Sequence, residues 1–183
     1  MILNTFEGCS SGSWKIEHLR PVTGESLPKA ACLNILPGHN AGNSPGFVWS
    51  LRGVTSYVRY VHRDEREQLT PLQPPLGRPE ATRAALIPIK KSETWWDLPQ
   101  DDRRKIFEEQ SRHIATGLKY LPAIARRLYQ SRELGEPFDF LTWFEYAPAD
   151  AAAFEDLVDA LRRTKEWTYV TREIDIRLIR MPE

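Results

Sequence analysis

The stretch that most restricts the fold of this chain is residues 112–127, which read RHIATGLKYLPAIARR. In the interior of a helix, a glycine such as Gly117 costs about 1 kcal/mol relative to alanine, and a proline such as Pro122 costs about 3 kcal/mol. Together these costs exceed what so short a segment gains from helix propensity. We therefore predict one helix that ends near Gly117 and a second that begins near Pro122, because proline suits a first helical turn.

The interruption decides whether His113 and Arg126 can face the same site. In one continuous helix, the two side chains would point roughly 220° apart and lie about 20 Å from each other along the axis. A break between them removes that constraint, so they can line one pocket. The pattern alone leaves open the alternative that both are unrelated surface residues.

The charge balance argues against broad classes of partner. The chain has 183 residues, with 25 basic and 25 acidic side chains and a formal net charge of +0. It therefore lacks the positive surface typical of proteins that bind nucleic acid or an anionic membrane. Its length suits one domain with a substantial core, which we expect to span residues 1–183. An anion would have to be held by a few well-placed cations.

Cysteines and apolar segments give an expectation about location. Cys9 and Cys32 are too few for a disulfide framework or a zinc site, so we expect isolated, partly buried thiols. The initial segment MILNTFEGCSSGSWK lacks the basic stretch and apolar core of a signal peptide. No apolar run approaches the roughly 20 residues that span a bilayer. We predict a soluble cytoplasmic protein, with a periplasmic one as the alternative if a leader has been removed.

The first half of the chain is typical of strands separated by loops. Alternating β-branched and aromatic residues predict strands at 14–22, 47–61 and 81–91. The separators 36–46 and 70–80 are rich in Pro and Gly, which interrupt both strand pairing and helices. Long ordered loops of this kind often border sites.

The second half contains helices as well. Helices are predicted at 97–113 and 149–167, and strands at 138–146 and 167–180. The later helix is amphipathic, with apolar residues spaced i, i+3, i+4 and i+7: Phe154, Leu157, Val158 and Leu161. This order predicts an antiparallel α+β fold with helices on one face of the sheet. The other face would remain open to a ligand or a partner subunit.

Four separated blocks of the second half resemble the chlorite dismutase family of haem b enzymes. They are KSETWW at 91–96, the pattern H-x4-L-x-Y-x5-R from His113 to Arg126, RRLYQSRELGEPFDFLTWFE at 126–145, and TKEW at 164–167. GVTSYVRY at 53–60 extends the resemblance into the first half. The short first half, residues 1–90, is similar to the small dimeric branch of the family, and residues 91–183 would ligate the haem.

The resemblance implies a fold and an assembly. It implies an α+β architecture of ferredoxin-like repeats, in which an antiparallel, barrel-like β-sheet carries helices on its outer face. It also implies a homodimer, with haem b as the cofactor and the small anion chlorite as the substrate.

The resemblance also assigns roles at the haem. His113 would be the proximal ligand of the iron, and Glu166 would accept a hydrogen bond from the other imidazole nitrogen. Arg126 would lie on the opposite, distal side as its one mobile cation. Arg127, next to it, would turn about 100° away toward solvent.

Further residues would line the distal side. Gln73 resembles a distal polar residue of the short branch. Thr142 and Phe144 alternate with Trp143, so they share one strand face and can wall a distal cavity. Core packing is equally compatible with these two residues.

A last group resembles the residues that hold the haem propionates and line the haem edge: Tyr60, Lys91, Trp95 and Trp96. A phenol, an ammonium and an indole N–H are the donors that a carboxylate in an apolar slot requires. Paired tryptophans are also typical of a core or an interface, and we expect one of the two to serve there.

The implied activity is the haem-dependent conversion of chlorite to chloride and dioxygen, through a ferryl haem and hypochlorite. Arg126 would hold the anionic oxidant in place. Two alternatives stay open: a coproheme decarboxylase of haem biosynthesis, whose distal residue is Gln rather than Arg, and a non-catalytic dimeric haem-binding module. Arg126 weighs against the first alternative, and its combination with His113 and Glu166 weighs against the second.

Overall fold

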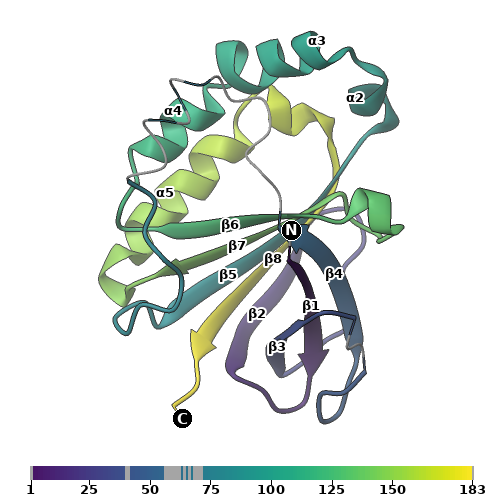
Figure 1. Cartoon of the computed structure of the whole chain (residues 1–183), viewed down its shortest axis with the longest axis vertical. Coiled ribbons are helices and arrows are strands. Elements are labelled where there is room, and N and C mark those ends of the chain that lie inside the picture. The colour runs from purple at the N-terminus through teal and green to yellow at the C-terminus, as the bar shows by residue number, and fades with distance from the viewer. Residues whose placement is uncertain are drawn as a thin grey trace.

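The computed structural model describes residues 2–39, 42–55, 63, 65, 67 and 72–182. The strands in this part of the chain are β1 (Leu3–Cys9), β2 (Trp14–Thr23), β3 (Cys32–Pro37), β4 (Trp49–Thr55), β5 (Arg83–Lys91), β6 (Ala125–Gln130), β7 (Phe140–Tyr146) and β8 (Val170–Arg180). All neighbours pair antiparallel, and the strands close into a barrel in the order β1-β3-β2-β8-β5-β7-β6-β4 (Figure 1).

The two halves of the barrel repeat the same strand order. The first half, β1 to β4, runs β4-β1-β3-β2 around the barrel, and the second half, β5 to β8, runs β8-β5-β7-β6. The halves join where β2 pairs with β8 and where β4 pairs with β6. Strands from both halves of the chain therefore make one continuous sheet.

Helices lie outside the second half of the barrel, as Figure 1 shows. The connections contain α2 (Glu93–Asp97), α3 (Gln100–Arg104), a π-helical segment (Lys105–Gln110) and α4 (His113–Leu118) between β5 and β6, α5 (Ala151–Arg162) between β7 and β8, and short 3-10 turns at Arg132–Leu134, Pro148–Asp150 and Glu166–Tyr169. Among the described residues, no helix has the length and apolar composition needed to cross a membrane.

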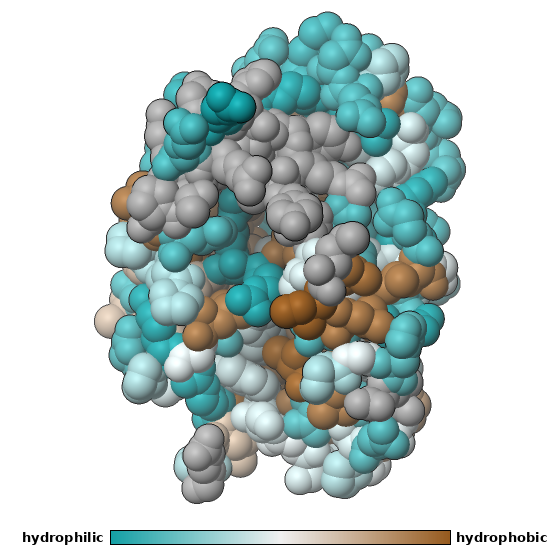
Figure 2. All heavy atoms as spheres, in the orientation of Figure 1, coloured by the Kyte–Doolittle hydropathy of each residue, from teal (hydrophilic) through white to brown (hydrophobic). Residues whose placement is uncertain are grey.

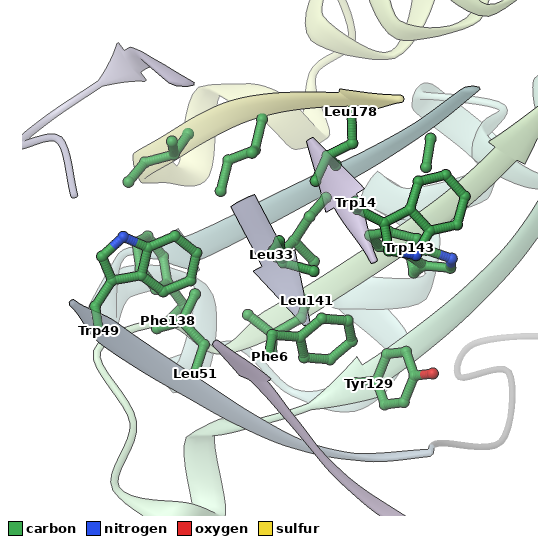
Figure 3. Close-up of a cluster of buried hydrophobic side chains, with 14 residues drawn as sticks. Phe6, Trp14, Leu33, Trp49, Leu51, Tyr129, Phe138, Leu141, Trp143 and Leu178 are labelled. Atoms are coloured by element: carbon green, nitrogen blue, oxygen red, sulfur yellow. The ribbon is translucent and has the colours of Figure 1, made fainter. Parts of the chain in front are cut away.

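The barrel interior is a packed hydrophobic core. Figure 3 shows Phe6, Leu33 and Trp143 among the side chains that gather there from different strands. Trp14 and Trp143 meet edge to face, with ring centroids 5.2 Å apart. The prediction that one sheet face stays open is wrong, because closure of the sheet turns that face into the core. The predicted antiparallel α+β architecture with helices outside the sheet is confirmed.

Alternate residues of the second-half strands point outward, toward the helices. Leu86 belongs to the interior core, whereas its neighbour Ile87 belongs to a second buried cluster shared with α5. In that cluster, the Phe154 ring of α5 lies 5.1 Å from the Phe144 ring and 4.4 Å from the Tyr146 ring, centroid to centroid. The predicted apolar face of this helix is thus the face that packs on the barrel wall.

The predicted end of a helix near Gly117 agrees with the structure, but the predicted second helix at Pro122 is wrong. α4 ends at Leu118, and Ala125–Gln130 forms β6. Pairing of β6 with both β7 and β4 supplies the backbone hydrogen bonds of an extended segment. Tertiary pairing therefore overrides the local pattern, as is common for strands.

Two other predicted elements differ in extent. The helix expected at 97–113 is present as α3 and the π-helical segment, which together end at Gln110, and Arg112, with a left-handed φ of 51°, separates them from α4. The strand expected at 47–61 is present as β4 over Trp49–Thr55, and residues 56–61 lie outside the described part of the chain.

Candidate functional site

A cavity of about 500 Å³ lies between the outer face of the second-half strands and the helices α4 and α5. This volume is within the range of roughly 300–1,000 Å³ typical of ligand and cofactor sites. The cavity brings together seven of the residues that the sequence predicted for a site: Gln73, Lys91, His113, Arg126, Thr142, Phe144 and Glu166. They come from strands, helices and a loop that are far apart in the sequence.

His113 is the first residue of α4, and its position is fixed by the segment before it. The Glu108 carboxylate accepts hydrogen bonds from the backbone N–H groups of Ile114 at 2.6 Å and Ala115 at 3.2 Å. These bonds satisfy free N–H groups at the start of the helix. The break at Arg112 and this cap together set the direction in which the His113 side chain enters the cavity.

A buried chain of polar groups holds the imidazole. Nδ1 of His113 lies 2.8 Å from Oε2 of Glu166, and Nζ of Lys91 donates to Oε1 of Glu166 at 2.6 Å. The Lys91 and Glu166 side chains are each only 3% exposed. Burial alone would raise the pKa of Glu166, but the Lys91 charge and the His113 imidazole lower it to about 2. The carboxylate is therefore ionised.

An ionised carboxylate can only accept a hydrogen bond, so Nδ1 of His113 must carry the proton and donate it in the bond to Glu166. This leaves the lone pair of Nε2 for a ligand in the cavity. A carboxylate in this position also makes the imidazole a stronger electron donor to a metal. This geometry is compatible with a histidine that ligates a metal and a carboxylate that orients it.

Aromatic rings fix the plane of the imidazole. The Phe107 and Trp167 rings both lie at 22° to it, with centroids 4.3 Å and 6.5 Å away. The indole N–H of Trp167 donates to Oε2 of Glu173 at 2.8 Å, and Glu173 also accepts from Nε of Arg162 at 2.8 Å. Neither Phe107 nor Trp167 was predicted, although Trp167 directly follows Glu166 in the sequence.

Arg126 enters the cavity from β6. It lies opposite Phe144 of β7 in the strand register. Burial lowers the pKa of Arg126, and among the described residues no carboxylate or hydrogen-bond acceptor contacts its guanidinium. An arginine stays charged in proteins, so this is a cation without a counter-ion from the described residues. It is a suitable place for a small anion. Arg127 is exposed, as predicted, but it also borders the cavity.

Of the residues expected at the haem edge, Lys91 lines the cavity, and the two tryptophans do not. Trp95 is fully buried and does not line the cavity, and Nζ of Lys91 lies 3.5 Å above its ring. Trp96 donates from its indole nitrogen to Oδ2 of Asp139 at 3.1 Å and is also outside the cavity lining. Tyr60 lies outside the described residues.

The cavity suits a flat, mostly apolar ring. Its walls include Ile87, Leu128 and Leu157, and Gly117 presents no side chain to it. His113 would offer an imidazole nitrogen to the iron, and the Arg126 cation lies in the same cavity. These residues therefore fit a haem.

Comparison with known proteins decides the family. A sequence model described as chlorite dismutase matches residues 40–181. The chain belongs to the chlorite dismutase family. This confirms the resemblance of the four sequence blocks. The chlorite dismutase of Ideonella dechloratans is 34% identical over 125 residues, which cover 67% of this chain and 42% of that protein.

Solved structures of chlorite dismutases share the fold. The crystal structure of a dimeric chlorite dismutase from Nitrobacter winogradskyi is 60% identical, with a TM-score of 0.91, and the match covers 97% of this chain and 99% of that one. A mutant chlorite dismutase from Candidatus Nitrospira defluvii in complex with cyanide is 20% identical, with a TM-score of 0.71 and a coverage of 99% and 91%. At that identity, the likeness concerns the fold alone.

Proposed function

We propose that this protein binds haem b in the cavity through His113 and converts chlorite to chloride and dioxygen. The observation that carries the proposal is the meeting of two groups in one cavity: the Glu166-bound imidazole of His113 and the guanidinium of Arg126. Membership of the chlorite dismutase family supports the same activity.

His113 would hold the haem iron through Nε2, and the bound haem would supply the oxygen-transfer and electron-transfer chemistry. Glu166 would keep the proton on Nδ1 and the ring in one orientation. The ammonium of Lys91 forms a buried ion pair with Glu166. We therefore propose that Lys91 supports Glu166 and His113 and does not bind a haem propionate. Tyr60 and Trp96 stay as candidates for the haem edge, and Trp95 for packing beneath Lys91.

Arg126 would hold chlorite beside the haem. The guanidinium offers several donors in a fixed plane, and burial strengthens its attraction for an anion. Conversion of chlorite to chloride and dioxygen releases and consumes no net proton. A fixed cation therefore suits the reaction better than an acid–base residue. Thr142, Phe144 and Gln73 would wall the space in which the anion is held.

We further propose that residues 1–183 form one haem domain built from two ferredoxin-like repeats. The support is the repeated strand order of the two barrel halves and, in the second half, the order strand, helices, strand, strand, helix, strand. The first half of the barrel would then be the shortened repeat.

We also propose a homodimer. The relative from Nitrobacter winogradskyi is a dimeric chlorite dismutase. Figure 2 shows hydrophobic residues gathered over the strands of the first half. Ile2, just before β1, and Phe47 and Val48, just before β4, are exposed. Exposed apolar patches of this kind often mark protein interfaces. Light scattering of the haem-loaded protein should give the mass of two chains, and a single-chain mass at micromolar concentration would refute the dimer.

The activity is tested with haem-loaded protein and chlorite in an oxygen electrode. We expect dioxygen equimolar with the chlorite consumed, and chloride as the other product. A parallel reaction with coproheme and peroxide tests the decarboxylase alternative, and we expect no haem b from it. Haem uptake without any dioxygen would contradict the proposal and favour a non-catalytic haem-binding protein.

A further inference from the structure

Gly117 lies in the cavity wall on α4, one helical turn after His113. Its backbone is helical and is not among the glycines with positive φ. Glycine is a poorer helix former than alanine, so this position weakens a helix of only six residues. Because the backbone does not require glycine here, the reason for it should lie in the space beside the Cα atom.

Arg126 borders that space. A Cβ atom built on Gly117 would meet, outside its own helix, only two described atoms within 4 Å: Nη1 of Arg126 at 3.5 Å and Cζ of Arg126 at 3.9 Å. The guanidinium thus lies directly against the helix that carries His113. A methyl group would still be at ordinary contact distance, whereas a branched side chain would extend into the guanidinium.

We propose that Gly117 is a positioning residue for Arg126, because the absence of a side chain larger than a methyl group leaves the guanidinium its space. No described carboxylate or other acceptor forms a hydrogen bond with the guanidinium. A bulky neighbouring side chain can therefore displace it at a small cost in free energy. This inference rests on the proposed function of Arg126 as the cation that holds a small anion. Gly117 is then the residue that determines where the Arg126 guanidinium can lie.

The inference is tested with haem-loaded protein and fluoride as the anion, titrated by absorbance. We expect Gly117→Val to weaken fluoride binding about tenfold and Gly117→Ala about threefold or less. The thermal midpoint of Gly117→Ala should equal or exceed that of the wild type, because alanine favours the helix. A loss of anion affinity without a loss of stability separates positioning from a structural defect.

A double-mutant cycle shows whether Gly117 acts through Arg126. In the Arg126→Ala background, Gly117→Val should change the fluoride dissociation constant by less than about twofold, since no guanidinium is left to displace. An equal effect in both backgrounds would overturn the inference, because Gly117 would then act on the haem or the helix directly. Wild-type affinity in Gly117→Val would overturn it as well.

Ala115→Val is the matched control. It adds similar bulk to the same helix at a residue outside the cavity lining, and we expect unchanged fluoride binding. If Gly117→Val retains no haem, Gly117→Ala carries the same cycle with a smaller expected effect. Fluoride binding by the wild type that does not depend on Arg126 would contradict the proposed function itself, and this result is distinguishable from a failure at Gly117 alone.

Discussion

The two halves of the barrel share one strand order, yet the cavity lies on the second half. On the first half, the Glu7 carboxylate of β1 accepts hydrogen bonds from the backbone N–H groups of Gly42 and Ser44, so a loop closes over the outer face of this strand. On the second half, α4 and α5 are inserted between strands, and they border a cavity together with the outer face of the sheet. The site therefore requires the inserted helices as well as the outer face of the sheet.

The same difference appears in the two faces of the second-half strands. The inward face packs in a dense core, whereas the outward face lines the cavity with charged and apolar groups. We expect changes on the inward face to alter folding and changes on the outward face to alter binding. The variants below test this division, from the largest expected effect to the smallest.

The largest effect is expected for His113→Ala, which removes the proposed iron ligand from the second half. Haem affinity should fall by more than the roughly 10- to 100-fold that loss of a histidine's orienting partner typically costs. His18→Ala in β2 is the control from the first half, and it should leave haem affinity unchanged. Absorbance titration of the two apoproteins with haem measures both. Equal affinities for the two variants would reassign the ligand.

Next in size is a cavity made in the core. Leu33→Ala in β3 should lower the free energy of unfolding by about 3 kcal/mol, because Leu33 is fully buried in the interior. Leu157→Ala, on the cavity wall, should cost less than half of this, since its side chain already borders open space. Urea denaturation compares the two proteins. A larger loss at Leu157 would show that the outward face carries the folding core.

A third comparison sets Arg126→Ala against Arg127→Ala. The first variant should keep haem but lose about 100-fold in chlorite turnover, as loss of a placed donor for a reacting anion typically does. It should also bleach sooner, because oxidising chlorine species escape from the cavity. Arg127→Ala removes a more exposed cation next to Arg126 that also borders the cavity, and it should retain activity. Full oxygen yield in the first variant would show that the reaction does not require Arg126.

The smallest effect is expected for Glu166→Gln, which should lower haem affinity about tenfold. It should also change the response to pH. Glu166 has a folded-state pKa of about 2, below its ordinary value of 4.5. A lowered carboxyl pKa contributes stability that is present above 4.5 and is lost as the pH falls toward 2. The variant should therefore show a flatter dependence of unfolding free energy on pH in this window. An unchanged slope would contradict the buried ion pair.

Much of the second half could be predicted from the sequence. The alternating residues of β5, β7 and β8 predicted strands, and the amphipathic pattern of α5 predicted a helix, because each pattern is a local periodicity. The roles proposed for His113, Glu166 and Arg126 came from the family resemblance. The structure brings all three side chains to one cavity, and their roles there stay predictions.

The errors lie where distant strands decide the outcome. Ile124, Leu128 and Tyr129 fit a helical spacing as well as a strand, and only pairing with β7 resolves the choice. Strands β1 and β3 went unpredicted, since each depends on the other for its hydrogen bonds. Closure of the barrel, which places the cavity on the helix side, likewise depends on pairing between β4 and β6.

The strict alternation in β7 has one more consequence. Leu141 and Trp143 belong to the interior, and Thr142 and Phe144 to the cavity. Inserting or deleting a single residue within this strand would exchange the two sets, placing a threonine in the core and an indole in the ligand space. Point substitutions at outward positions can therefore change the site without disturbing the core, whereas a change in the length of β7 would disrupt both.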